Sequence, residues 1–210
     1  MSFDRLAPHY RWLERVMAGN LLQRARVAHL AAIDDAQNIL LVGEGPGRFL
    51  AALRKRRPDV PITVVDASAR MLAEAQAVSV GPTTFLKIDL TQTNLPSGKW
   101  EAVVSHCFLD CFAPATLERV VANLAAAATA EAHWLITDFA LPPSGWRRTR
   151  ARIVHALMYR AFRISTQLAA RQWTDPDHWL QHSGFHLQVR REFNHGLIRA
   201  DHWRRGDFAE

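Results

Sequence analysis

The residues best placed to do chemistry are three glycines at alternate positions, Gly43, Gly45 and Gly47, which follow an apolar run of strand length. Glycine lacks a side chain and adopts positive φ easily, so a ligand can approach the backbone at such a turn. A strand, a glycine-rich turn and a helix are typical of sites for nucleotide-containing ligands, although such a turn can be purely structural. The dinucleotide fingerprint G-x-G-x-x-G would need glycine where Arg48 stands, so the spacing disfavours NAD.

Two aspartates follow the next two apolar segments and strengthen this interpretation. Asp66 ends the second predicted strand, where a carboxylate can accept hydrogen bonds from both hydroxyls of a ribose. Asp89 ends the third between Ile88 and Leu90, which suits an adenine that needs apolar walls and an acceptor for its amine. Either aspartate alone could simply cap a strand end. Because ligands of open α/β sheets bind at the carboxyl ends of the strands, the two together favour a cofactor site.

The elements that must position these residues alternate along the chain. The predicted strands are 38–43, 61–66, 83–90, 100–108 and 132–141. The predicted helices are 46–57, 67–77 with Ser68 as its N-cap, and 114–128; the alanine-rich tract 124–132 is interpreted as a helix end. Segments 185–193 and 197–205 flank the turn Asn194-His195-Gly196 and predict an antiparallel hairpin. The fold class is therefore α/β: a Rossmann-like open sheet, mostly parallel, with an antiparallel C-terminal hairpin and helices on both faces.

The chain is interpreted as a single domain, 1–210, with N-terminal cap helices in 1–33 and a helical insert at about 146–182. In the insert we expect one apolar stripe that faces an acceptor pocket, made of Ile153, Val154, Leu157, Met158, Ala161, Phe162 and Leu168. We expect three arginines on the opposite face, Arg152, Arg160 and Arg163. The alternative is a basic amphipathic surface that contacts an anionic membrane.

The charge of the chain is uneven. The formal net charge is +6, and the whole surplus lies after residue 145, where 12 arginines face 6 acidic residues. This distribution indicates an anionic partner or substrate for the C-terminal third, or simply a solvated basic face. Cys107 and Cys111 are the only cysteines and lack a second pair for a zinc site, so we expect free thiols in a reducing compartment and a cytoplasmic protein. No apolar run approaches the roughly 20 residues that span a bilayer.

Together these features resemble the class I S-adenosylmethionine-dependent methyltransferases that act on small molecules. The motifs that carry the resemblance are GEGPG, VVDAS, KIDL, the closing hairpin, and the N-terminal FDRLAPHY, which is similar to the family's cofactor-capping helix. The resemblance implies S-adenosyl-L-methionine as cofactor, with the glycine turn at its methionine part, Asp66 at its ribose and Asp89 at its adenine. The cofactor-binding residues that it implies are Gly43, Glu44, Gly45, Gly47, Asp66, Ala67, Met71, Asp89, Leu90 and His106. Leu41 stands where the family often has an acidic residue, and Glu44 is a candidate replacement.

Candidate catalytic residues follow the fourth strand, in the segment SHCFLDCF (105–112), where this family builds the floor of its acceptor pocket. His106 and Asp110 are four residues apart, so one helical turn would pair them and orient the imidazole as a base. Alternatively, His106 packs beneath the cofactor and Asp110 caps the next helix. Tyr10 could close over the methionine end or donate to the substrate, and Asp138 is a further residue at the rim. No metal is required for this chemistry.

The predicted function is therefore methyl transfer to a small, apolar or amphiphilic acceptor. Two alternatives within the class are an RNA methyltransferase that uses the basic C-terminal third, and a lipid or quinone methyltransferase at a membrane surface. A non-catalytic S-adenosylmethionine-binding protein and a nicotinamide oxidoreductase rank lower.

Overall fold

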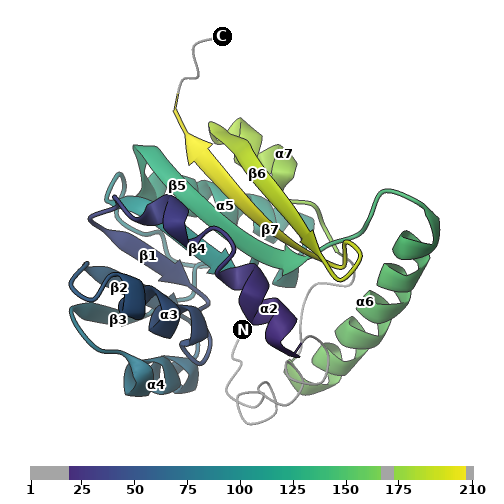
Figure 1. The fold of residues 1–210 in the computed structure, drawn as a ribbon, viewed down its shortest axis with the longest axis horizontal. Helices are drawn as coiled ribbons and strands as arrows, with labels where there is room; N and C mark the ends of the chain where they lie inside the picture. The colour runs from purple at the N-terminus through teal and green to yellow at the C-terminus, as the bar shows by residue number, and fades with distance from the viewer. Residues whose placement is uncertain (1–18, 167–172, 207–210) are drawn as a thin grey trace.

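The computed structural model describes residues 19–166 and 173–206, which form a seven-stranded sheet in the order β3-β2-β1-β4-β5-β7-β6 (Figure 1). The strands are β1 (Ile39–Val42), β2 (Ile62–Asp66), β3 (Thr83–Lys87), β4 (Trp100–His106), β5 (Ala128–Phe139), β6 (Phe185–Phe193) and β7 (Ile198–Arg205). The first five pair in parallel, whereas β7 runs antiparallel to both β5 and β6. The predicted fold class, with its closing antiparallel hairpin, is confirmed.

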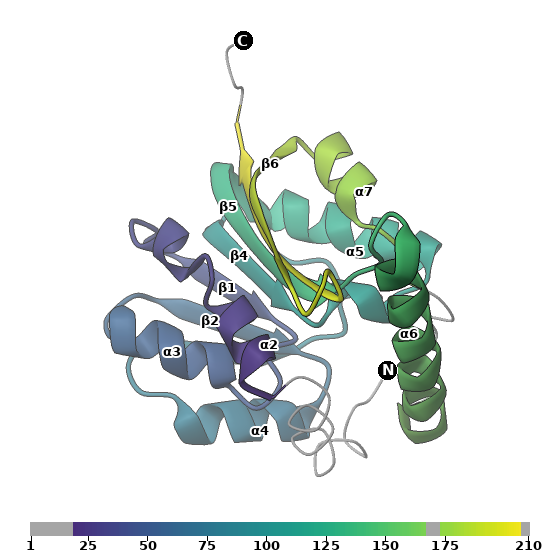
Figure 2. The same ribbon diagram turned by 45° about the vertical axis from the view of Figure 1, so that its right-hand side comes forward.

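Helices cover both faces of this sheet (Figure 2). The helical elements are α2 (Gly19–Arg26), η1 (Leu30–Ile33), α3 (Arg48–Arg56), α4 (Ala69–Val78), η2 (Leu109–Cys111), α5 (Pro114–Ala127), α6 (Gly145–Thr166) and α7 (Asp177–His182). One core cluster joins η1, α3 and α4 to the sheet, and another joins α5 and α7 to the opposite face. Every residue of β1 is buried because both of its faces are covered, which explains its unbroken apolar sequence.

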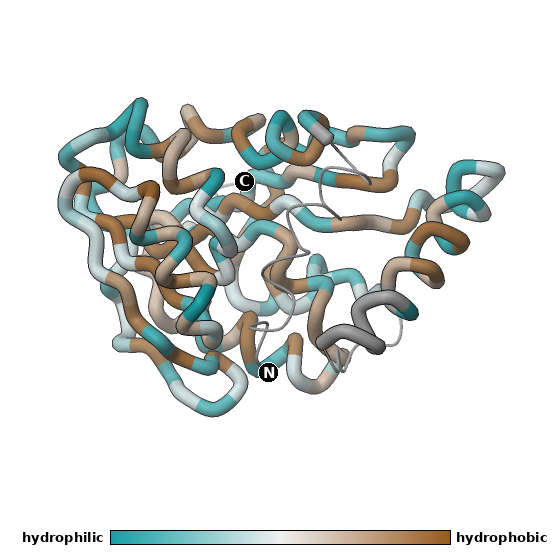
Figure 3. The backbone as a smooth tube through the Cα atoms, turned by 90° about the horizontal axis from the view of Figure 1, so that it is seen from below, coloured by the Kyte–Doolittle hydropathy of each residue, from teal (hydrophilic) through white to brown (hydrophobic). Residues whose placement is uncertain are grey.

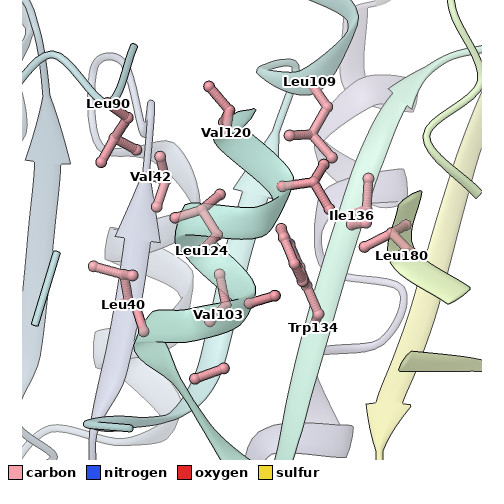
Figure 4. Close-up of a cluster of buried hydrophobic side chains, with 14 of the residues drawn as sticks. Leu40, Val42, Leu90, Val103, Leu109, Val120, Leu124, Trp134, Ile136 and Leu180 are labelled. Carbon is pink, nitrogen blue, oxygen red and sulfur yellow. The ribbon is translucent and has the colours of Figure 1, made fainter. Parts of the chain in front are cut away.

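The core beneath α5 shows how the larger cluster is packed (Figure 4). Val120 and Leu124 of α5 lie over Val103 of β4, and Trp134 of β5 fills the space toward α7. The indole nitrogen of Trp134 donates a hydrogen bond to Ser105 Oγ at 3.0 Å, so the large side chain is buried without an unsatisfied donor.

The alanine-rich tract joins a helix directly to a strand. The helix α5 ends at Ala127 and β5 begins at Ala128, so the prediction of a helix end holds only as far as Ala127. Ala128 already pairs with Trp100 of β4, and the backbone amide of Gly98 donates to the carbonyl of Ala126 at 2.8 Å. Sheet pairing therefore overrides the helical preference of alanine, and β5 starts four residues before the predicted 132.

The insert forms α6, which stands at the edge of the molecule beyond the sheet (Figure 1, Figure 2). Among the side chains of α6 that the structure describes, those of Ala151, His155 and Met158 are buried, whereas Ile153 and Leu157 are exposed. The predicted apolar stripe is therefore wrong for Ile153 and Leu157, because the buried face includes a small and a polar residue that apolar periodicity does not reveal. The side chains of Ala161, Phe162, Arg163 and Leu168 lie outside the described residues. Within the described ranges, no helix has the length and apolar character needed to cross a membrane.

Part of the C-terminal arginine surplus is used inside the fold. Arg190 bonds Asp177 and Asp201, with Nη2–Oδ2 and Nε–Oδ1 distances of 2.8 Å. Arg199 Nη2 lies 2.9 Å from Asp175 and 2.7 Å from Asp177. These ion pairs tie α7 to β6 and β7, and a buried charge left without its partner would cost about 3–5 kcal/mol. The two arginines therefore hold the hairpin in place and do not face a partner.

Candidate functional site

A pocket opens at the carboxyl ends of the central strands, where β1 lies between β2 and β4 and the strand order reverses. Counted out to its open mouth, the pocket encloses about 740 Å³, part of which is open to solvent. Its lining residues are Val42, Gly43, Gly45, Val65, Asp66, Ala67, Met71, Ile88, Asp89, Leu90, Thr91, Cys107, Phe108, Cys111 and Phe112. Of the predicted cofactor-binding residues, seven are in this lining: Gly43, Gly45, Asp66, Ala67, Met71, Asp89 and Leu90.

The three glycines of the turn have different surroundings. Gly45 has φ +62°, and a Cβ there would meet nothing within 4 Å, so its backbone faces open space beside the pocket. A Cβ on Gly43 would lie 2.4 Å from the ring of Phe108, so this glycine lets the ring lie against β1. A Cβ on Gly47 would lie 2.6 Å from Val78 Cγ2, which means that Gly47 lets α3 approach α4. Gly47 is therefore a packing residue outside the pocket lining, unlike the prediction.

Glu44 caps a helix and is not in the pocket lining. Its Oε1 accepts hydrogen bonds from the backbone amides of Phe49 and Leu50 at 2.8 and 2.9 Å, at the start of α3. Burial of the carboxyl group raises the pKa of Glu44 to about 7, although these amides and the charge of Arg26 act in the opposite direction. Glu44 therefore binds the helix N-terminus through Oε1, and its role as a replacement for the acidic side chain missing at Leu41 stays a prediction.

Asp66 and Asp89 both line the pocket and both stabilise the turn that follows their strand. Asp66 Oδ1 accepts from the amide of Ser68 at 2.8 Å. Asp89 Oδ1 accepts from the amide and hydroxyl of Thr91 at 3.0 and 2.6 Å, and Oδ2 accepts from Gln92 Nε2 at 3.3 Å. Partial burial raises the pKa of Asp89, but the two donors of Thr91 outweigh it and keep the pKa below its usual value. The two interpretations of these residues, strand-end cap and site residue, are thus compatible.

His106 is buried on the side of β4 that packs against α3, and it does not form the pocket floor as predicted. Its ring meets the ring of Phe49 edge-on at 4.7 Å, and neither ring nitrogen has a hydrogen-bond partner among the described residues. Burial, with the charges of Arg26 and His29, holds the pKa of His106 well below its usual value, so the imidazole is neutral. The predicted pair with Asp110 is therefore not formed, and His106 is absent from the pocket lining. The physical reason is strand alternation, which turns this last residue of β4 toward α3.

The segment after β4 supplies other side chains to the pocket. Cys107 has φ +54°, and the turn that it makes is held by the amide of Phe108, which donates to Asp138 Oδ1 at 3.0 Å. The rings of Phe108 and Phe112 meet edge-on at 5.0 Å and form an aromatic wall. The predicted segment thus does line the pocket, but through residues other than His106 and Asp110.

Asp110 and Asp138 are two buried carboxyl groups behind this wall. Burial raises the pKa of Asp110 to about 6. Burial and the nearby charge of Asp110 raise the pKa of Asp138 well above its usual value. Asp138 therefore acts on the pocket indirectly, by holding the amide of Phe108.

Asn123, which the sequence interpretation missed, holds the third pocket segment in place. It is buried in α5, where its Oδ1 accepts from the amide of Leu95 at 2.9 Å and its Nδ2 donates to the carbonyl of Thr93 at 2.9 Å. These bonds fix the chain that follows Asp89. A single amide among the apolar residues of helix 114–128 was the available signal.

Val42, Val65 and Thr91 also line the pocket and were missed. The segment 105–112 was predicted as the pocket floor, but the four residues by which it lines the pocket were not singled out: Cys107, Phe108, Cys111 and Phe112. All follow or end a strand, which was the only signal that could have found them. Tyr10 lies outside the described residues. Of the described residues that line the pocket, none belongs to α6, so these residues include no lid of the predicted kind.

The sequence from 39 to 130, which holds the glycine turn and both aspartates, matches the family model described as a methyltransferase domain. No curated protein matches the sequence. This match covers less than half of the chain, and together with the sheet order it is consistent with the class I S-adenosylmethionine-dependent methyltransferases that the motifs resemble.

Solved structures share this fold over nearly the whole chain. The mitomycin 7-O-methyltransferase MmcR has a TM-score of 0.68 and 19% identity over 98% of this chain, which spans only 61% of that protein. The 1,6-didemethyltoxoflavin-N1-methyltransferase of Burkholderia thailandensis has a TM-score of 0.65 and 16% identity, with 96% of this chain and 88% of that chain covered. The magnesium protoporphyrin IX methyltransferase (ChlM) of Synechocystis PCC 6803 has a TM-score of 0.63 and 18% identity, with 97% of each chain covered. At these identities the likeness establishes the fold alone.

Proposed function

We propose that the chain is an enzyme that transfers a methyl group from S-adenosyl-L-methionine to a small acceptor of apolar or amphiphilic character. The observation that carries the proposal is the pocket at the switch point, which combines an open glycine turn, two strand-end carboxylates and an apolar wall. The methyltransferase-domain match over the same residues supports it. The solved structures of similar fold include methyltransferases that act on small molecules, such as the mitomycin and didemethyltoxoflavin enzymes.

The residues present fit this cofactor. Gly45 leaves space for a ligand against its backbone, and Asp66 presents a carboxylate beside it for a ribose. Ile88 and Leu90 provide apolar walls on either side of Asp89, which suits an adenine ring. The part least like the family is the methionine end, because Glu44 is bound to α3.

When bound, the cofactor supplies an electrophilic methyl group on a sulfonium sulfur, and the S–CH₃ bond breaks as the acceptor atom bonds the carbon. The chain has to hold the acceptor in line and keep water out, which the wall of Phe108 and Phe112 can do. Among the described residues that line the pocket, the ionisable ones are two aspartates, Cys107 and Cys111. Burial raises the pKa of Cys111 well above its usual value, so its thiol stays protonated. We therefore favour an acceptor whose nucleophile needs no strong base, such as an amine or an acidic enol.

Three of the twelve C-terminal arginines are used within the fold and lend no support to the RNA alternative. Arg190 and Arg199 are paired with aspartates, and Arg205 donates to the carbonyl of Ala125 at 2.7 Å. These cations are therefore occupied within the fold and are not displayed for phosphate contacts.

Calorimetric titration of the full chain with S-adenosyl-L-homocysteine and, separately, with NAD⁺ tests the cofactor. We expect micromolar binding of the first and none of the second; binding of NAD⁺ alone would overturn the proposal. Incubation with methyl-labelled cofactor and a set of amines, enols and phenols of increasing apolar size then tests the acceptor. Label should pass to the extractable small molecules. In a parallel incubation with RNA, transfer of label to RNA and to none of the small molecules would refute the acceptor class.

A further inference from the structure

Three large apolar side chains are exposed along one side of α6. Trp146, Ile153 and Leu157 are 61%, 58% and 65% exposed. Their spacing of seven and four residues places them on the same face of an α-helix. Ala151 and Met158, on the other side, are buried, so this exposed face is distinct from the one by which α6 packs. A contiguous apolar face of this kind commonly marks an interaction site.

The same helix carries only positive charge. Its sequence, GWRRTRARIVHALMYRAFRIST, contains six arginines and no acidic residue. Arg147, Arg152 and Arg160 are exposed, and none of the three has an ion pair with another residue of the described chain. Arg147 lies over the ring of Trp146, with 5.9 Å from the guanidinium carbon to the ring centroid. Cations therefore flank the apolar face, and these three have no acidic partner among the described residues.

The helix is held firmly at its start and projects from there. Arg150 donates to the side-chain and backbone oxygens of Asn194 at 2.9 and 3.2 Å, and the ring of Trp146 lies 5.3 Å from that of His195. These contacts tie the first turns of α6 to the β6–β7 turn. Figure 3 shows hydrophobic and hydrophilic residues alternating along α6 at the edge of the molecule. The face is thus presented to the surroundings on a helix whose first turns are anchored to the β6–β7 turn.

We propose that the exposed face of α6, with Trp146, Ile153 and Leu157 at its centre, docks the protein on a membrane that contains anionic phospholipids. The three apolar side chains enter the headgroup region and the flanking arginines pair with lipid phosphates, as in interfacial amphipathic helices. A second copy of the chain fits less well, because two all-positive helices repel each other. A nucleic acid would leave the aliphatic side chains of Ile153 and Leu157 unused. The proposal goes beyond methyl transfer, and lipid binding can be measured without it.

Vesicle co-sedimentation of the full chain tests this, with phosphatidylcholine vesicles that contain phosphatidylglycerol compared with phosphatidylcholine alone. We expect binding to the anionic vesicles at low salt, little binding to the neutral ones, and weakening as salt rises. The double variant Arg152→Gln/Arg160→Gln should bind anionic vesicles about 30-fold more weakly, at about fivefold per charge. Ile153→Ser/Leu157→Ser should also weaken binding, but without removing its salt dependence.

The matched control is Arg70→Gln/Arg119→Gln, which removes two exposed arginines from α4 and α5 and leaves α6 intact. This control should bind vesicles like the unaltered chain. Equal losses of vesicle binding in the two double variants would overturn the proposal, because net charge and not α6 would then drive binding. Absence of anionic-vesicle binding at low salt would also overturn it, as would a dimer that Ile153→Ser/Leu157→Ser dissociates. Titration of each variant with S-adenosyl-L-homocysteine checks folding and reports separately on the proposed function.

Discussion

Replacement of Asp66 by alanine separates the two roles that the structure gives this carboxylate. It lines the pocket, and its Oδ1 accepts from the amide of Ser68 at 2.8 Å. A hydrogen bond to a charged group contributes about 1.5–3 kcal/mol, whereas an ordinary one contributes about 1 kcal/mol. The bond from the Ser68 amide goes to a charged carboxylate, so the variant should lose about 1.5–3 kcal/mol of stability and, separately, weaken cofactor binding.

The binding loss follows from the acceptor capacity of the side chain. One carboxylate oxygen already accepts from Ser68. The binding free energy lost in the variant should therefore be smaller than that of two independent hydrogen bonds to a ribose. We expect Asp66→Ala to cost about 2–3 kcal/mol of binding, which raises the Kd for S-adenosyl-L-homocysteine about 30- to 150-fold. Asp66→Asn keeps an acceptor for Ser68 but loses the charge, so it should lose less stability than the alanine variant, and its Kd should be about tenfold higher.

Isothermal titration calorimetry measures both variants, and thermal unfolding followed by circular dichroism measures their stability. Asp59→Ala is the control, because this exposed aspartate lies between α3 and β2, outside the pocket lining. An unchanged Kd in folded Asp66→Ala would refute the assignment of Asp66 to the cofactor. A loss of binding that matches the loss of folded protein would mean that Asp66 is only a cap.

Two further predictions concern the turn and the buried histidine. Gly47→Ala should lower the free energy of unfolding by about 1–3 kcal/mol more than Gly98→Ala. Both glycines have positive φ, but only at Gly47 would a Cβ lie against Val78. Equal losses of stability in urea denaturation would count against the tight approach of α3 to α4. His106 is neutral in the folded protein while the unfolded chain protonates below about pH 6.5, so stability falls by up to about 1.4 kcal/mol per pH unit below that pH. His106→Gln should flatten the pH dependence of Tm between about pH 5 and 6.5 by this contribution, and parallel curves for the two proteins would contradict it.

The strands and helices were predictable because local patterns encode them. The N-cap of α4 is an example, since Ser68 Oγ accepts from the amide of Met71 at 3.2 Å, as its position before a helical pattern predicts. The turn at Asn194, His195 and Gly196 is another, because all three have positive φ and such residues tolerate that conformation best. The glycine turn and the two strand-end aspartates likewise located the pocket, because parallel strands bring their carboxyl ends to one edge.

The side-chain directions at the strand ends could not be read in the same way. His106 and Asp110 are four residues apart, but the first is still in a strand and points toward α3, so helical spacing does not apply to the pair. Asp138 reaches Phe108 only because β4 and β5 are neighbours in the sheet. Such contacts join residues remote in sequence, and no local pattern records them.

The insert also combines a feature that the sequence predicted with one that it did not. Its sequence predicted a helix, since apolar residues recur at helical spacing over residues 146–168. The outward direction of Ile153 and Leu157 was decided by the packing of Ala151, His155 and Met158. The sequence by itself determined which segments form helices and strands, because these depend on residues that are neighbours in the chain. It also indicated where the pocket lies, because the carboxyl ends of parallel strands share one edge of the sheet. Only the tertiary structure decided which side chains enter the pocket and which face of α6 remains exposed, because burial depends on what each face meets.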